Sequence, residues 1–193
     1  MMPARTDLPR YVAADQLPPD TAPPTAIDIV WAAAASWCVW HKAVLGQSDE
    51  LTEIAADLRL ERYFTSDESA FLADDGEIVP SNCSQTPVSQ FVEPLGCLER
   101  CEKIWTLLWS IGIVEELSVV DTRQSTAATL ALFAGRSAED IVYEARRKST
   151  ADIARALDSL RMARQLQCSD VSVQVLQSRI DALEWVQGTK EPE

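Results

Sequence analysis

The 193 residues carry a net charge of −13, from 30 acidic and 17 basic side chains, and 47% of them are hydrophobic. This hydrophobic content is that of an ordinary globular chain. The negative net charge disfavours direct binding to nucleic acid, because the phosphate groups would repel it. A chain of this length can bury one core and does not need two. We therefore expect a single acidic domain over residues 25–188, preceded by an arm at residues 1–24 and followed by a tail at residues 189–193, with a basic partner favoured.

Three features favour a cytoplasmic protein without a membrane partner. The five cysteines are an odd number at irregular spacing, which does not suggest a disulfide framework. The first twenty residues lack the basic head and apolar run of a secretory signal. The longest apolar stretch, residues 29–40, has twelve residues, whereas a helix that spans a bilayer needs about twenty. We therefore predict a buried helix at residues 29–40.

Helical periodicity dominates the chain after an extended arm. Six of the ten prolines lie in the arm, where each removes a backbone donor and disfavours helix. From Thr25 as the N-cap, apolar residues recur at helical spacing from Ile27 to Leu45, and Gly46 ends this helix. Four further helices are predicted over residues 66–73, 98–111, 122–134 and 173–188. Two more begin at about residue 48 and at residue 137, and another, marked by Ile153 and Leu157, ends at about residue 167.

The predicted fold is an all-α, single-domain bundle of seven or eight helices with an extended proline-rich N-terminal arm. A high density of helix breakers predicts a long irregular connection at residues 74–96, and a small hairpin near Ile78 or Val119 stays open as an alternative. The charged residues of the helix at 98–111 are expected to face solvent. They are Glu99, Arg100, Glu102 and Lys103.

No motif for catalysis, metal binding or cofactor binding is evident. His41 is the only histidine, and we interpret it as a buried, hydrogen-bonded residue and not as a general base. Cys97 and Cys101 lie four residues apart, but a closed zinc site needs four ligands and the chain offers no second pair at suitable spacing. We therefore predict that the protein is not an enzyme and holds neither metal nor cofactor.

Acidic residues are concentrated at residues 49–77. This acidic segment holds ten acids and two bases, Arg59 and Arg62, which give a net charge of −8 in 29 residues. Such a concentration can steer a basic protein, although a solubilising surface with acids at helix starts is the simpler explanation. The candidate partner-binding residues are Asp49, Glu50, Glu53, Asp57, Asp67, Glu68, Asp74, Asp75 and Glu77.

Two helical motifs resemble those of a bacterial family called domain of unknown function 4272. In the motif ERCEKIWTLLWSIGIVEEL, residues 99–117, the matching positions are Arg100, Leu107, Leu108, Trp109 and Gly112. In the motif SRIDALEWVQG, residues 178–188, they are Arg179, Ala182, Leu183 and Trp185. The likeness spans roughly residues 25–188. Glu102 aligns only loosely, and Ser178 stands where the family has glutamate.

The resemblance implies an all-helical bacterial protein without assigned catalysis. Some proteins that look like this family lie beside type VI or contact-dependent toxins and act as their immunity proteins. We therefore expect an immunity protein that occludes a cognate toxin acting in the cytoplasm, and a basic nuclease is the favoured kind of toxin. We expect the immunity protein to be a monomer or a weak homodimer. The alternatives are a helical adaptor that binds another cellular protein, and a carboxylate-based enzyme using Glu99 and Glu102 with Arg100.

Overall fold

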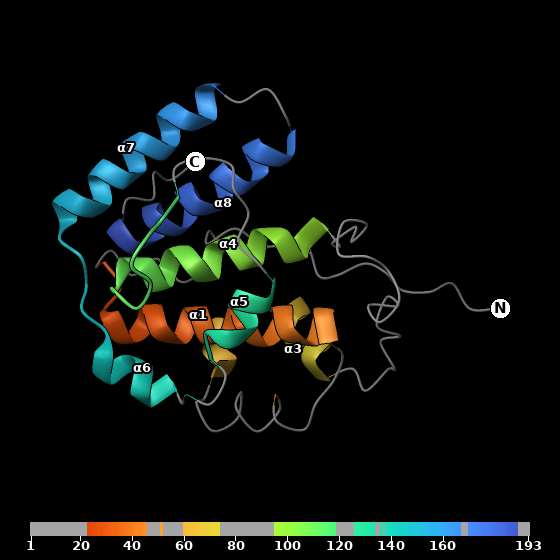
Figure 1. Ribbon diagram of the computed structural model, residues 1–193. Helices are drawn as coiled ribbons and strands as arrows, with labels where there is room; N and C mark the ends of the chain where they lie inside the picture. Colours follow the sequence, from red (N-terminus) through yellow and green to blue (C-terminus); the bar gives the residue numbers. More distant parts are fainter. Residues whose placement is uncertain are drawn as a thin grey trace.

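The computed structural model describes residues 23–45, 51, 60–73, 95–118, 126–133, 136, 138–166 and 170–188, and it contains helices and no strand in these ranges. Two long helices, α1 (Ala26–Leu45) and α4 (Leu95–Ser110), lie side by side, and α8 (Asp170–Gln187) packs against α4 (Figure 1). The last long helix, α7 (Thr150–Leu166), lies along the outer side of α8. The prediction of an all-α fold is therefore confirmed for the described residues.

Four short elements surround the pair formed by α1 and α4. The 3-10 helix η2 (Leu60–Tyr63), α3 (Ser66–Ala73) and α6 (Ala138–Glu144) contact α1, and α5 (Thr126–Ala131) contacts α4. The helix predicted over residues 66–73 therefore has its predicted bounds. Three predicted features lie outside the described residues: the alternative hairpin near Ile78 or Val119, residues 1–22 of the arm, and residues 74–94 of the connection. The count of seven or eight helices therefore stays a prediction.

Helix α1 begins where its cap residues place it. The backbone N–H of Asp28 donates to Thr25 Oγ1 at 3.2 Å, and the N–H of Thr25 donates to Asp28 Oδ2 at 3.0 Å. This reciprocal pair satisfies two amide groups at the helix start. The prediction that the apolar face of this helix runs from Ile27 to Leu45 was wrong at its ends, because these two side chains are 48% and 49% exposed. Between them twelve of the seventeen residues are buried, so α1 is a central helix with contacts on several sides.

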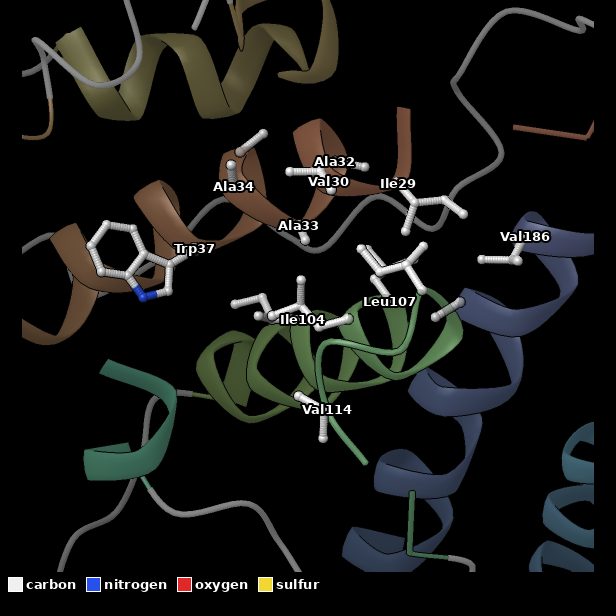
Figure 2. Packing of buried hydrophobic residues seen from close by; sticks show 14 of the residues in the cluster. Ile29, Val30, Ala32, Ala33, Ala34, Trp37, Ile104, Leu107, Val114 and Val186 are labelled. Atoms are coloured by element: carbon white, nitrogen blue, oxygen red, sulfur yellow. The ribbon is translucent and has the colours of Figure 1, made fainter. Parts of the chain in front are cut away.

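The core lies mainly where α1, α4 and α8 meet. Ala33 of α1 lies opposite Ile104 and Leu107 of α4, and Val186 of α8 closes the same cluster (Figure 2). All four side chains are at most 2% exposed. Small residues on α1 allow the larger side chains of α4 to fill the interface between the two helices. The alanine-rich sequence of α1 is therefore suited to close packing against α4.

Helix α4 ends at a glycine, as the sequence predicts. Gly112 has a φ of +75°, its N–H donates to the carbonyl oxygen of Trp109 at 3.0 Å, and the N–H of Ile113 donates to that of Leu108 at 3.0 Å. These two bonds form the glycine cap that satisfies the last carbonyl groups of a helix. A Cβ at Gly112 would lie 3.1 Å from the carbonyl oxygen of Arg146. Both the backbone angle and the close approach therefore require glycine.

Replacing Gly112 with alanine should lower the free energy of unfolding by about 1–3 kcal/mol, because a side chain in the left-handed region costs roughly 1–2 kcal/mol and the new methyl group crowds Arg146. Urea denaturation followed by circular dichroism measures the change. Gln165→Ala, at an exposed position of α7, is the control and should change stability by less than about 0.5 kcal/mol. Equal stabilities of the two variants would contradict the proposed role of Gly112.

Candidate functional site

Two charged residues of α4 are buried, contrary to the prediction that they face solvent. Arg100 is 1% exposed and Glu102 is 0% exposed, while Glu99 and Lys103 are half-buried. The prediction failed because α4 has contacts with α1, α5 and α8 and so lacks a wide solvent-facing side. Burying a charge is costly unless a partner of opposite charge and hydrogen bonds compensate for the lost water. Each buried charge of α4 has such a partner.

Glu102 is paired with Arg179 of α8, which is also 0% exposed. Arg179 Nε and Nη2 each lie 2.8 Å from Glu102 Oε2, and Arg179 Nη1 donates to the carbonyl oxygen of Ser118 at 2.6 Å. The guanidinium group therefore connects α4, α8 and the segment that follows α4. Charge-assisted hydrogen bonds of this kind have strict geometry, so the pair fixes the position of α8 on α4.

Arg100 is paired with Glu68 of α3. Its Nη1 donates to Glu68 Oε1, while Glu68 Oε2 accepts the backbone N–H of Thr65 at 2.8 Å. The N–H of Glu68 in turn donates to Thr65 Oγ1 at 3.1 Å, which completes a capping box at the start of α3. Burial raises the pKa of Glu68, but the charge of Arg100 and the hydrogen bonds from Thr65 and Arg100 hold it below its ordinary value. One carboxylate thus both caps α3 and joins it to α4.

A lysine of α1 holds the other end of α3. Lys42 is 0% exposed, its Nζ donates to the carbonyl oxygen of Leu72 at 3.0 Å, and it lies 5.3 Å from the centre of the Phe71 ring. A cation is favourable at this end of a helix, where the backbone carbonyl groups carry partial negative charge. Helix α3 is therefore attached at both ends by cationic side chains. Arg100 of α4 binds Glu68 near its start, and Lys42 of α1 binds the carbonyl oxygen of Leu72 near its end.

Further ionisable residues lie near Arg100. Burial lowers the pKa of Lys103 to about 8, with an added lowering from the like charge of Arg100. Burial also raises the pKa of Glu99, and the negative charge of Asp181 on α8 raises it further. These residues form a group of coupled charges between α3, α4 and α8, which we call the Arg100 group: Glu68, Glu99, Arg100, Lys103 and Asp181. Such groups of perturbed residues are frequent at functional sites, although structural ion pairs perturb pKa values too.

The structure places two of the nine predicted partner-binding acids. Asp67 is exposed on α3, whereas Glu68 is 9% exposed and is bound to Arg100. Glu68 therefore has an internal role, and we no longer count it among the surface acids. The other seven lie outside the described residues: Asp49, Glu50, Glu53, Asp57, Asp74, Asp75 and Glu77.

The remaining candidate residues have ordinary structural surroundings. His41 is half-buried, with its ring 4.7 Å from that of Trp37. Cys101 is buried, with its Sγ 2.8 Å from Thr129 Oγ1, and the side chain of Cys97 lies outside the described part of the chain. Within that part, no three residues among His, Cys, Asp and Glu are grouped as a metal site would require. None of its helices is long and apolar enough to cross a membrane.

An open hollow of about 620 Å³ lies beside the end of α4. Its lining includes the half-buried Trp105, the exposed carboxylates Glu115 and Glu116, and the backbone segment that leads to Ser118. The indole Nε1 of Trp105 donates to Thr129 Oγ1 at 2.8 Å, so the ring is held in place. An aromatic face with two acids is suited to contact with a cationic side chain.

Replacing Glu102 with glutamine should lower the free energy of unfolding by about 3–5 kcal/mol, because Arg179 would stay buried without an anion. The double variant Glu102→Leu with Arg179→Met should lose less stability than the sum of the losses in Glu102→Leu and Arg179→Met, since neither charge is left alone. Urea denaturation of wild type, Glu102→Gln, these two single variants and the double variant tests this. Glu184→Gln, which breaks the exposed pair with Arg161, is the control and should cost less than about 1 kcal/mol.

The Glu68 pair should make stability depend on pH. Because folding lowers the pKa of Glu68 from its ordinary 4.5, its contribution is complete above pH 4.5 and is lost as the pH falls through the folded value. The difference in unfolding free energy between wild type and Glu68→Gln should therefore narrow as the pH falls below 4.5. Chemical denaturation across this range measures it. Asp67→Asn, at the exposed neighbouring acid, should not show the same narrowing.

Comparison with known proteins places the chain in a family. A family model described as "Domain of unknown function (DUF4272)" matches residues 24–193. No curated protein and no solved structure matches the chain. The matched range contains all the described helices and both buried ion pairs of α4. The chain therefore belongs to the domain of unknown function 4272 family, as the resemblance of the α4 and α8 motifs indicated.

Proposed function

We propose that this chain is an immunity protein, which binds a secreted antibacterial toxin acting in the cytoplasm and neutralises it by occlusion. The observation that carries the proposal is the acidic segment, with ten acids and two bases in residues 49–77. Removing the internally paired Glu68 from the ten leaves nine acids for a partner. A toxin that cleaves DNA or RNA needs a basic cleft, so an acidic inhibitor complements it electrostatically.

The attachment of α3 supports this proposal. This helix lies within the acidic segment and carries the exposed Asp67. Its start is joined to α4 through Glu68 and Arg100, and its end is joined to α1 through Lys42. A binding surface that is already ordered loses less conformational entropy when a partner binds. Asp67 is therefore presented on a fixed helix and not on a loose segment.

The partner itself decides between this function and the alternatives. Tagged protein purified from its native host should recover a basic, toxin-like protein in equal amount, as mass spectrometry of the eluate would show. Co-expression of the chain with that protein should restore growth that the toxin alone stops. Recovery of a housekeeping protein, with no protection from any toxin, would overturn the proposal and favour a helical adaptor.

The acidic segment should set the rate of association with the toxin. Reversing Asp49, Glu50, Asp74 and Asp75 to lysine should slow association by about tenfold or more at low ionic strength, and by less in high salt, because screening weakens electrostatic steering. Surface plasmon resonance with the purified toxin measures the rate.

A second quadruple variant controls for net charge. It reverses four exposed acids outside both the acidic segment and the hollow, and therefore changes the total charge by the same amount: Glu139, Asp140, Glu144 and Asp158. Association of this variant should stay within about threefold of wild type. An equal slowing in both variants would assign the effect to overall charge and remove the acidic segment as the binding surface.

A further inference from the structure

The open hollow of about 620 Å³ beside the end of α4 is as large as many small-ligand sites. The half-buried Trp105 lines it, and the bond from its indole Nε1 to Thr129 Oγ1 at 2.8 Å fixes the ring. Lys148 lies 5.0 Å from the centre of the Trp109 ring, but no cation of the described residues lies over Trp105. The exposed part of the Trp105 ring is therefore available to an occupant of the hollow.

The wall of the hollow that follows α4 is held at both ends. Val114 is 8% exposed in the core (Figure 2), and its N–H donates to the carbonyl oxygen of Leu108 at 3.4 Å. At the other end, the carbonyl oxygen of Ser118 accepts a hydrogen bond from Nη1 of the buried Arg179 at 2.6 Å. Because the wall is fixed before anything binds, little conformational entropy is lost when the hollow is filled.

The charge of the hollow is negative. Glu115 and Glu116 lie between the two anchored ends of this wall, and both are exposed. Neither carboxylate has an ion pair or a hydrogen bond among the described residues. The described lining contains no basic residue, since its other members are Trp105, Val114, Leu117 and Ser118. Two unpaired carboxylates beside an aromatic ring complement a cationic group.

Arginine matches this combination better than lysine does. The planar guanidinium group stacks on an indole ring, and its N–H groups along the edge can donate to a carboxylate at the same time. The ammonium group of lysine is a strongly hydrated point charge and has no flat face. Trp105 and the two glutamates therefore favour a guanidinium group over other cations.

We propose that the hollow receives an arginine side chain of the partner protein. The guanidinium group lies on the ring of Trp105 and donates to Glu115 or Glu116. The identity of the partner as a toxin rests on the proposed function, whereas the arginine site rests on the described residues alone. The acidic segment then sets the rate of encounter, and the hollow sets how long the complex lasts.

Nuclear magnetic resonance of the indole groups tests the site without any toxin. Nα-acetylarginine amide is titrated into the full chain labelled with ¹⁵N, at an ionic strength kept constant with sodium chloride. The Nε1–H resonance of Trp105, assigned by its loss in Trp105→Phe, should shift and saturate. The Nε1–H resonance of Trp40, which is 0% exposed, should stay in place. A Trp105 resonance that does not move would overturn the proposal.

Two matched compounds separate the effect of charge from the effect of shape. Nα-acetylcitrulline amide has a planar end of the same length without a charge, and it should bind at least about threefold more weakly. Nα-acetyllysine amide has the charge without the planar group, and it should also bind more weakly than the arginine compound. Equal binding of the citrulline compound would overturn the electrostatic argument, and tighter binding of the lysine compound would overturn the choice of arginine.

Two double variants test whether the glutamates of the hollow bind the cation. Glu115→Gln with Glu116→Gln should raise the dissociation constant for the arginine compound about threefold or more, because both anions are lost. Glu139→Gln with Asp158→Asn changes the net charge equally at exposed positions outside the hollow, and it should leave the constant unchanged. Equal weakening in both variants would assign the effect to overall charge and overturn the site.

The purified toxin tests the identity of the partner separately. In surface plasmon resonance, Glu115→Gln with Glu116→Gln should dissociate from the toxin about threefold faster, with association within about twofold of wild type. Failure of the titration with the arginine compound would overturn the arginine site and leave the proposed inhibition standing. A successful titration with unchanged dissociation from the toxin would overturn the toxin as the source of the arginine.

Discussion

The ion pair between Glu102 and Arg179 determines how the long helices fit together. Apolar contacts between α4 and α8 are tolerant of small shifts along the helix axes, because many arrangements bury similar areas. A pair of fully desolvated charges is not tolerant, since a shift would leave both charges buried without compensation. Arg179 also binds the carbonyl group of Ser118, so the segment after α4 is positioned by the same contact. The apolar core is therefore built around a polar constraint.

The second buried pair extends this constraint to the surface. Arg100 lies on α4 two residues before Glu102, and through Glu68 it positions α3. Because Glu68 also caps α3, the pair acts on both the start and the placement of that helix. Lys42 adds a contact at the other end of the helix. The acidic face that we assign to a partner thus rests on the same helix, α4, that forms the centre of the core.

Local sequence signals predicted the helices well and the burial of their charges poorly. Thr25 as a cap and Gly112 as a stop act within a few residues, so the start of α1 and the end of α4 could be read from the sequence. The start of α4 was predicted less well, because this helix begins at Leu95 and not at residue 98. The pairing of Glu102 with Arg179 joins positions 77 residues apart, and no periodicity reports such a contact. The available signal was that Arg100 and Arg179 both lie at positions where the α4 and α8 motifs resemble those of the family. An arginine within a motif of packing residues favours a buried role over a surface one.

Glu68 connects the buried charges of the core to the proposed binding surface. It has three hydrogen-bonded contacts, two with Thr65 and one with Arg100. Asp67 lies one residue before Glu68 on α3, so a shift of Glu68 away from Arg100 would also move this exposed acid. The placement of an acid that we assign to the partner therefore depends on an ion pair inside the fold. A substitution that breaks this pair would alter the binding surface as well as the stability of the chain.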